Sequence, residues 1–518
     1  MGARPSGIAL SDDGRTAAVA CQSDGTVAVL RIAGPALRLE ARVPVGAEPR
    51  GVAILPGGRL ALAAVSGEDS AALVDLETRR VIRQARVGTE PWRVAIAPDG
   101  RTAAVGCARS REVVVLDAQT LEVRHRVDLR GGNVRHVAIS PDGRWAYVPH
   151  IAERGFATTR ENIDLGWVTA SRLSRVPLAA RGHRQAISLD PRGRAVGDVD
   201  GVAVSPDGAL LALTAAGTHE LLLLREPLPF VTFGGPGDHI DPELLRDSRR
   251  FRRIPLGGRP LAVRFHPDGR SVVVANYLSN ALQVVDTESG EVRGTIALGG
   301  PAAPSLVRRG EAIFYDAQRS FNQWYSCSTC HVEGHTNGSK FDTSNDGSYD
   351  TPKKTLSLRG VARTGPWTWH GWKPDLRALV RDSLTRSMQG PEPAEQDLDA
   401  LMAFLKTLDF APRRPATPES RRGEVLFRAR KCDSCHAPPD YTSPGIYRVG
   451  LESPSDAHQG FNPPPLRGVG TRAPYLHDGR AGSLSEVLVR WHTPSRLTGT
   501  PDFTPEELAD MISFLRTL

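Results

Sequence analysis

Short runs of Val, Ala, Ile and Leu recur along roughly the first 300 residues, and polar turns separate them. The runs at 94–96 and 102–105 flank Pro98-Asp99-Gly100, and a further run follows at 113–116. Pro presets one backbone torsion and Gly accepts a positive φ, so Pro-Asp-Gly predicts a tight hairpin between two strands. The hydrophobic pattern therefore predicts short antiparallel strands throughout this part of the chain.

The turn signature recurs at a regular spacing. The glycines that close the turns are Gly14, Gly58, Gly100, Gly143, Gly208 and Gly269. The first four lie 44, 42 and 43 residues apart, whereas the last two intervals lengthen to 65 and 61, which is one repeat plus an insertion. Four short strands per repeat of this length are typical of a β-propeller blade. We expect an all-β propeller of six or seven blades over residues 1–303.

The residue pattern of the repeat, as in residues 87–127, resembles the YVTN-type propeller repeat, and the resemblance extends from residue 3 to about 300. Insertions at about 150–195 and 225–255 interrupt the later repeats. We expect them to be surface loops that project from one rim, and the alternative is a role in covering a site or gripping a partner.

Beyond residue 304 the pattern changes to helices, and a two-fold duplication begins. Arg-Gly-Glu at 309–311 recurs at 422–424, and a terminal Phe-Leu-x-x-Leu at 404–408 recurs at 514–518. A Pro-rich linker at about 411–420 separates the two copies. The sequence therefore predicts two all-α domains after the propeller, over residues 304–412 and 413–518.

Each predicted helical domain carries one CxxCH motif. The motifs are Cys327, Cys330 and His331 in the first domain and Cys432, Cys435 and His436 in the second. Two thiols on one turn add to the vinyl groups of haem, and the adjacent imidazole then binds the iron. A zinc site or a redox dithiol would need further cysteines nearby or a thioredoxin-like βαβ pattern, and residues 304–518 contain neither. We therefore expect the two all-α domains to be cytochrome c domains, with two covalent haem c groups and with His331 and His436 as proximal iron ligands.

Charge and hydropathy narrow the class of protein. The chain has 518 residues and a net charge of +7, but its basic and acidic residues are interspersed, which argues against nucleic acid as a partner. No apolar run is long enough to span a membrane. Because haem is attached to CxxCH outside the bacterial cytoplasm, we expect a periplasmic or extracellular protein, although the chain carries no export signal.

Residues 305–518 resemble the bacterial di-haem cytochrome c peroxidase family. The resemblance rests on the tandem CxxCH domains, on Leu-Arg-Gly-Val-Gly-Thr-Arg-Ala-Pro-Tyr-Leu-His-Asp-Gly at 466–479, and on the terminal Phe-Leu-x-x-Leu. It implies an oxidoreductase that takes electrons from a small cytochrome or cupredoxin and reduces hydrogen peroxide or oxidises a partner. In the family a Trp lies between the two haems, and Trp369 takes that place here.

The second domain departs from the family, which usually places a Met on its electron-storing haem. No Met lies in that region, and the ligand position falls at Trp491 or His492, of which only His492 can bind iron. His477 is the alternative, although the family pattern places that His in a turn. Two His ligands would give this haem a lower potential than a His/Met pair.

The first domain offers several candidates near the distal face of its haem. Met388 could bind the iron, and His370 is a second possible ligand. Gln389 or Glu392 could act on bound peroxide, as a polar group or as a general acid–base. The residues leave these roles open.

Two hypotheses follow from the sequence. The first is a peroxidase-type enzyme in which small molecules react at the haem of Cys327 and Cys330, and Trp369 passes oxidising equivalents to the other haem. The second is an electron-transfer cytochrome in which both irons are six-coordinate and the propeller is a docking platform. Fold analogy alone does not choose between them.

Overall fold

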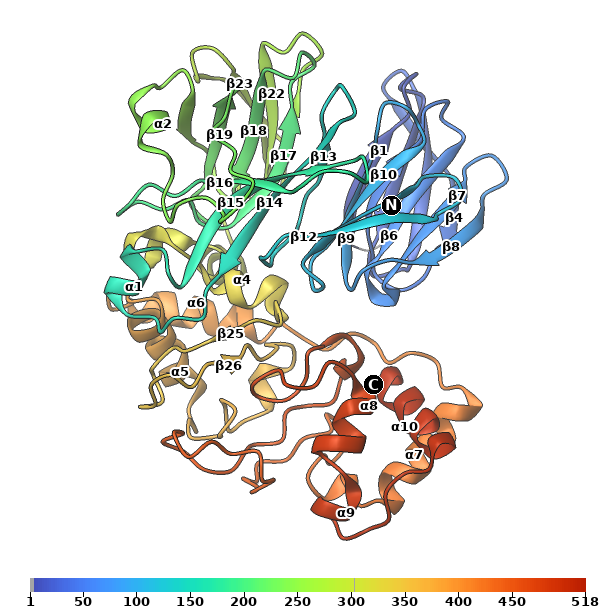
Figure 1. Cartoon of the computed structure of the whole chain (residues 1–518), viewed down its shortest axis with the longest axis vertical. Helices are drawn as coiled ribbons and strands as arrows, with labels where there is room; N and C mark the ends of the chain where they lie inside the picture. The colour runs from blue at the N-terminus through green and yellow to red at the C-terminus, as the bar shows by residue number, and fades with distance from the viewer. Residues whose placement is uncertain (1–3, 302) are drawn as a thin grey trace. The chain divides into compact units, whose positions relative to one another are not determined.

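The computed structural model describes residues 4–301 and 303–518, and the chain divides into two compact units (Figure 1). The first unit contains the residues up to Glu153, Thr169–Gly300 and Asn322–Trp324. The second contains Arg154–Val168, Pro301–Phe321 and Tyr325–Leu518. The chain therefore enters the second unit for a short segment, residues 154–168, before the first unit is complete.

The first unit is a β-propeller with six four-stranded antiparallel blades within the described residues. The first three blades are β1 (Pro5–Leu10), β2 (Thr16–Cys21), β3 (Thr26–Ala33) and β4 (Ala36–Pro44); β5 (Pro49–Ile54), β6 (Leu60–Val65), β7 (Ser70–Asp75) and β8 (Arg80–Arg86); and β9 (Pro91–Ile96), β10 (Thr102–Cys107), β11 (Glu112–Asp117) and β12 (Val123–Asp128). The last three are β13 (Ala138–Ile139), β14 (Trp145–Glu153), β15 (Thr169–Pro177) and β16 (Gln185–Ser188); β17 (Val199–Val204), β18 (Leu210–Ala215), β19 (Glu220–Arg225) and β20 (Phe251–Pro255); and β21 (Pro260–Phe265), β22 (Ser271–Asn276), β23 (Ala281–Asp286) and β24 (Val292–Ala297). The predicted propeller is confirmed.

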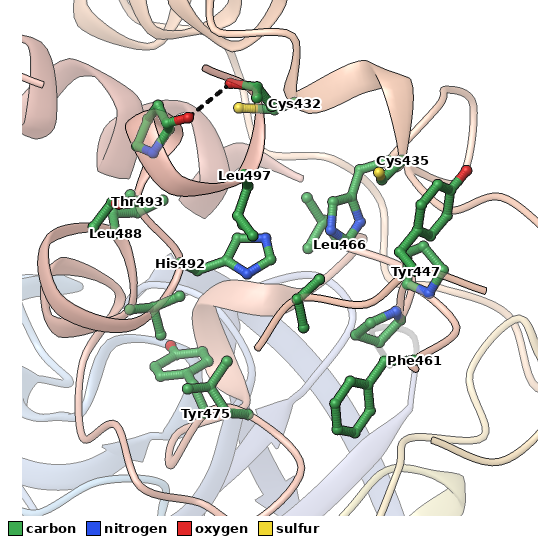
Figure 2. A pocket seen from close by; sticks show the side chains of 18 of the residues that line it. Cys432, Cys435, Tyr447, Phe461, Leu466, Tyr475, Leu488, His492, Thr493 and Leu497 are labelled. Atoms are coloured by element: carbon green, nitrogen blue, oxygen red, sulfur yellow. Dashed lines mark hydrogen bonds between the residues drawn. The ribbon is translucent and has the colours of Figure 1, made fainter. Parts of the chain in front are cut away.

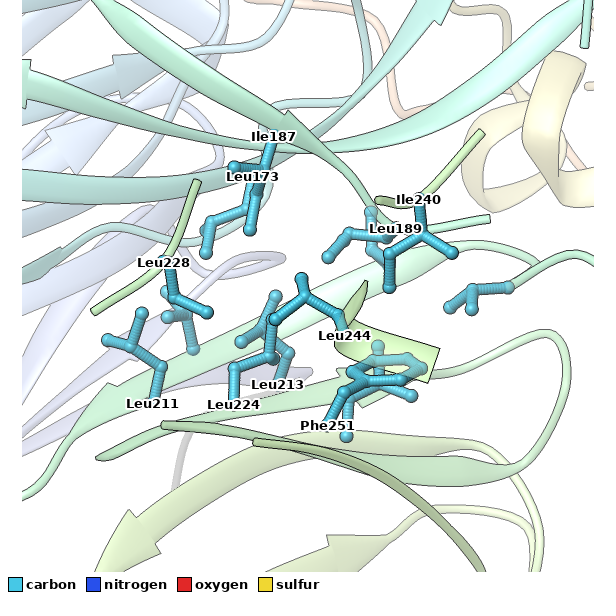
Figure 3. Packing of buried hydrophobic residues seen from close by; sticks show 14 of the residues in the cluster. Leu173, Ile187, Leu189, Leu211, Leu213, Leu224, Leu228, Ile240, Leu244 and Phe251 are labelled. Carbon is cyan, nitrogen blue, oxygen red and sulfur yellow. The ribbon is translucent and has the colours of Figure 1, made fainter. Parts of the chain in front are cut away.

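Hydrophobic side chains between neighbouring blades form the core of this unit. Figure 3 shows one such layer, where Leu173 and Ile187 of the fourth blade lie near Leu213 and Leu224 of the fifth. Leu244 of the short helix α2 (Pro242–Arg246) belongs to the same cluster and is 1% exposed. Our expectation that the insertions are only surface loops was wrong, because they supply strands β15, β16 and β20 and part of the core.

The second unit contains a short segment with helix α1 and two helical halves. Its helices are α1 (Arg160–Asp164), α3 (Leu306–Phe314), α4 (Cys327–Cys330), α5 (Leu376–Asp382), α6 (Glu395–Leu405), α7 (Pro418–Ala429), α8 (Leu484–Glu486), α9 (Pro494–Leu497) and α10 (Pro505–Thr517), and a small hairpin joins β25 (Lys340–Phe341) to β26 (Lys353–Lys354). We call α3 to α6 the first half and α7 to α10 the second half. This helical region agrees with the predicted cytochrome c fold class.

Each half is built around one pair of crossing helices. In the first half α3 packs on α6, and in the second α7 packs on α10. The repeated Arg-Gly-Glu places Gly310 and Gly423 at these crossings. A Cβ at Gly310 would overlap the carbonyl oxygen of Ala400, and one at Gly423 would overlap that of Asp510. The glycine of the repeat therefore permits the two helices to approach backbone to backbone.

The duplication extends to the loops that follow. Trp367 forms an isolated bridge with Lys373, and Tyr475 forms the corresponding bridge with Ala481 in the second half. Two residues further along the chain, Trp369 and His477 occupy equivalent positions of the two halves. The scaffold is thus shared, and the two halves differ in the side chains that they place on it.

Candidate functional site

The first CxxCH motif forms helix α4, which Ser326 caps through its side chain. His331 follows, and its Nδ1 lies 2.9 Å from the carbonyl oxygen of Leu356. A carbonyl oxygen can only accept a hydrogen bond, so Nδ1 donates and the lone pair is on Nε2. Burial lowers the pKa of His331 to about 4, which keeps the ring neutral. A neutral imidazole fixed by its other nitrogen is the form that binds a metal.

The second motif has the same local design. His436 Nδ1 lies 3.1 Å from the carbonyl oxygen of Tyr441, so this nitrogen also donates. Burial lowers the pKa of His436 to about 4. Both motifs therefore hold a neutral imidazole whose Nε2 is available as a ligand.

A largely apolar cavity adjoins the second motif (Figure 2). Its lining includes Cys432, Cys435, Leu466, Tyr475, Leu488 and Leu497. The rings of His436 and His492 both face it, with their centres 6.4 Å apart. His492 Nδ1 is buried without a hydrogen-bond partner among the described residues, and burial lowers the pKa of His492 to about 3.

This arrangement fits a haem between the two imidazoles. A metal–imidazole bond is about 2 Å long, so two rings on opposite sides of one metal have centres about 6 Å apart. The observed separation of His436 and His492 agrees with that spacing. The thiols of Cys432 and Cys435 lie in the wall of the same cavity, where they could bond to a macrocycle.

The residue opposite the motif is placed in both halves by one unusual turn. Helix α5 continues into a π-helical turn, Ser383–Ser387, and the next residue is Met388. Helix α8 continues into the π-helical turn Val487–Trp491, and the next residue is His492. The backbone N–H of Met388 bonds to the carbonyl of Ser383 at 2.9 Å, and that of His492 to the carbonyl of Val487 at 2.7 Å. Met388 and His492 therefore occupy equivalent positions.

Met388 is only 4% exposed, and its Sδ lies 3.9 Å from the Sγ of Cys327. The structure thus brings this candidate ligand to the first CxxCH motif. We call Cys327–His331 with Met388 the first site, and Cys432–His436 with His492 the second site.

Trp369 belongs to the first half but lines the cavity of the second site. Its Nε1 donates a hydrogen bond of 2.6 Å to the carbonyl oxygen of Lys354. Its ring meets that of His477 edge-on, with the centres 6.3 Å apart. Burial lowers the pKa of His477 to about 4. Trp369 is therefore held at the junction of the two halves.

His370, the alternative ligand for the first site, makes its contacts with the second half. Its ring stacks on Phe461 with the centres 4.8 Å apart, and Nδ1 lies 2.7 Å from the carbonyl oxygen of Gly460. Nε2 lies 3.7 Å from the carboxylate of Asp456. These contacts direct both ring nitrogens toward the second half.

Gln389 and Glu392, the candidates for acting on peroxide, are engaged elsewhere. Gln389 Nε2 donates to the carbonyl oxygens of Arg386, at 2.6 Å, and Thr158, at 3.2 Å. The Glu392 side chain is 62% exposed and forms an ion pair with Arg381. In these contacts, neither side chain meets Cys327 or Met388.

The C-terminal part of the chain is similar to several curated proteins. It is 25% identical over 284 residues to methylamine utilization protein MauG of Methylorubrum extorquens, which is 42% of this chain and 79% of that protein. It is 27% identical over 281 residues to hydrazine synthase subunit gamma of Kuenenia stuttgartiensis, again 42% and 79%. Cytochrome c551 peroxidase of Nitrosomonas europaea is 25% identical over 112 residues, 18% of this chain and 33% of that protein. No family model matches the chain.

The C-terminal part resembles di-haem peroxidases. Together with the CxxCH motifs and the fit of the cavity at the second site, the comparison supports haem as the cofactor. Within residues 4–301 and 303–518, no helix is long and apolar enough to cross a membrane.

Sequence reasoning did not find the main-chain groups that orient the site. The carbonyl oxygens of Leu356 and Tyr441 fix the two motif histidines, and that of Lys354 fixes Trp369. Main-chain acceptors have no residue signature. The sequence does contain a signal for the equivalence of Met388 and His492, because the number of residues between them nearly equals the number between the two CxxCH motifs.

Proposed function

We propose that the chain binds two haem c groups, one at each site. Cys327 and Cys330 attach the first, and Cys432 and Cys435 attach the second. His331 and Met388 would hold the iron of the first site, and His436 and His492 would hold that of the second. A bound haem supplies one-electron redox chemistry and, where its sixth ligand exchanges, a place for a small molecule.

We further propose an oxidoreductase of the cytochrome c peroxidase type, in which the first site is reactive and the second site relays electrons. The observation that carries this proposal is that two equivalent π-helical turns are followed by different residues, Met388 in the first half and His492 in the second. A thioether is a weak ligand of ferric iron and exchanges more readily than imidazole. A His/Met pair also raises the potential above that of a His/His pair, so an electron passes downhill from the second site to the first.

In this proposal the substrate is hydrogen peroxide, or alternatively a partner to be oxidised. Two electrons and two protons convert one peroxide into two waters, and a small cytochrome or cupredoxin supplies the electrons one at a time. Trp369 lies on the route between the sites, where its indole is fixed by Lys354. The reaction takes place in the periplasm or outside the cell, where haem is attached to CxxCH.

A second function is favoured by one observation. Met388 is buried and already lies beside Cys327, so both sites have a sixth ligand at hand. If Met388 does not exchange, the protein is an electron carrier, and the propeller serves to dock its partner.

Spectroscopy of the purified holoprotein separates the two functions. EPR and absorption spectra of the ferric and half-reduced protein are recorded with and without cyanide and peroxide. We expect an exogenous ligand to bind first at the first site, and Met388→Ala to make that iron high-spin and faster to react. His492→Ala should change the spectrum of the second site and leave peroxide reactivity at the first in place. Loss of reactivity in His492→Ala with retention in Met388→Ala would reverse the roles, and no ligand binding at either iron would favour the carrier.

A further inference from the structure

We propose that the main chain of residues 354–356 is the bonded route by which an electron passes between the two sites. The inference rests on the proposed function, because it requires a haem at each site. The main chain of residues 354–356 would connect the two sites into one redox unit.

One end of the route is the proximal ligand of the first site. His331 Nδ1 donates a hydrogen bond of 2.9 Å to the carbonyl oxygen of Leu356. The other end is the indole of Trp369, whose Nε1 donates a hydrogen bond of 2.6 Å to the carbonyl oxygen of Lys354. The first length is typical of an N–H···O hydrogen bond, and the second is slightly shorter than typical. Three residues of continuous main chain therefore join the imidazole of one site to an indole in the wall of the other.

Trp369 reaches the second site directly. It lines the same cavity as His436 and His492. No further residue needs to intervene between the indole and the cavity that fits the second haem.

Lys354 also secures this segment to the second half. Its backbone N–H bonds to the carbonyl oxygen of His477 at 2.6 Å, and its Nζ bonds to the carbonyl oxygen of Arg472 at 2.6 Å. The side chain is buried, with the residue 6% exposed. A lysine with its amine committed to a main-chain acceptor on the opposite half fixes the distance between the halves at the point where the electron crosses.

The middle of the route is held from the side. Thr336 Oγ1 donates to the carbonyl oxygen of Thr355 at 2.7 Å, and the N–H of Thr355 bonds to the carbonyl of Ser339 at 2.9 Å. The segment is thus fixed at each of its three residues. Electron tunnelling is faster through covalent and hydrogen bonds than across gaps, so a fixed bonded path is favoured over one through loosely packed side chains.

The transfer itself moves one electron and no atom. With haem held by His436 and His492 at the second site and by His331 and Met388 at the first, the second site would be oxidised by one electron and the first reduced by one. The hydrogen bonds of His331 and Trp369 remain in place throughout.

The test measures electron transfer between the sites without substrate. Pulse radiolysis delivers one electron to the fully ferric holoprotein, and the different spectra of the two sites report its redistribution. We expect Trp369→Phe, which removes the indole donor, to slow this redistribution several-fold while both midpoint potentials and the number of haems per chain stay as in the parent. The matched control is Trp367→Phe, because Trp367 donates at 2.8 Å to the carbonyl of Val361 and belongs to the same loop. The control should redistribute its electron at the parental rate.

A second variant tests the middle of the route. Thr336→Val removes the hydrogen bond to the Thr355 carbonyl, and also the one of 3.0 Å that Thr336 Oγ1 accepts from the Gly338 N–H, without replacing His331, Trp369 or either sixth ligand. We expect a smaller slowing with unchanged potentials. Parental rates in both Trp369→Phe and Thr336→Val, with two haems bound, would overturn the route. A chain that binds a single haem by mass spectrometry and the pyridine haemochrome assay would instead overturn the proposed function.

Discussion

The two helical halves share a backbone and differ at the residue that follows the π-helical turn. In the first half that residue is Met388, beside Cys327, and in the second it is His492, facing His436 across a cavity. The helix crossings and the following loops are repeated closely. One duplicated scaffold can therefore hold two sites of different ligand strength, because the ligand depends on a single side chain.

The halves also differ in what secures that turn. Gln389 follows Met388 and bonds to the main chain of Thr158, in the segment that lies between β14 and β15 in the sequence. Thr493 follows His492, and its hydroxyl meets the hydroxyl of Ser495 two residues away. The turn of the first site is thus tied to a distant part of the chain, whereas the turn of the second is tied locally.

The largest effect is expected at the helix crossings, which the two halves share. Gly310→Ala and Gly423→Ala should each lower the free energy of unfolding by about 3 kcal/mol or more, because each new methyl group overlaps a carbonyl of the crossing helix. Thermal unfolding followed by circular dichroism measures the loss. Gly482→Ala is the control, since its Cβ would meet nothing closer than 3.8 Å. A strong loss in only one half would show that the scaffold is not equivalent in both.

The next effect concerns the contact between the halves. Lys353 bonds to Asp456 at 2.7 Å, and the Asp456 side chain is 1% exposed. Burial acts to raise the pKa of Asp456, but the hydrogen bond and charge of Lys353, together with smaller contributions from the Ser453 N–H and His370, outweigh it, so the pKa lies below its ordinary value. Lys353→Met should lower the free energy of unfolding by about 2 kcal/mol at neutral pH. Lys406→Met, at an exposed position of the first half, should leave it unchanged.

The pH dependence of this pair has a defined sign. A carboxylate whose folded pKa is depressed stabilises the protein above its unfolded pKa of about 4, and the stabilisation is lost as pH falls through the folded value. The difference between the parent and Lys353→Met should therefore shrink on acidification below about pH 4. Chemical denaturation at several pH values measures it, and a constant difference would contradict the assignment to Asp456.

Exchanging the ligands should make the two sites alike. Met388→His should lower the midpoint potential of the first site by on the order of 100 mV, because a second imidazole replaces the thioether. His492→Met should raise the potential of the second site. Spectroelectrochemical titration of each variant measures both sites, and an unchanged potential at the first site would remove Met388 from the iron.

The smallest effect is expected at the residue that ties down the first turn. Gln389→Ala removes the side-chain bonds to Thr158 and Arg386, and should let Met388 exchange several-fold faster. Stopped-flow measurement of cyanide binding reports this rate. Thr493→Ala is the matched control at the equivalent position of the second half, and it should leave cyanide binding at the first site unchanged. Equal rates in all three proteins would mean that Gln389 does not restrain the turn.

Much of this organisation could be predicted from sequence, because it rests on local or repeated signals. Pro-Asp-Gly turns have a fixed backbone preference, so their spacing predicted the blades. Sequence could not place His370, since its stacking on Phe461 depends on how the two halves meet. It could not find the carbonyl acceptors either, because every residue carries one. The sites of Gln389 and Glu392 were suggested by a family resemblance, and their contacts depend on neighbours that are remote in sequence.

The segment 154–168 has a consequence for how the chain is made. It is synthesised with the fourth blade, yet its neighbours Asp342 and Gln389 emerge from the ribosome only much later. Since domains tend to fold as they are synthesised, the segment would remain exposed to solvent while the propeller strands that precede and follow it in the sequence fold. Phe156, which is 47% exposed even in the finished fold, would then be a point of vulnerability to proteases. A single cut after residue 300 would separate this segment from the helices that it contacts, so neither half of a divided gene would encode a complete unit.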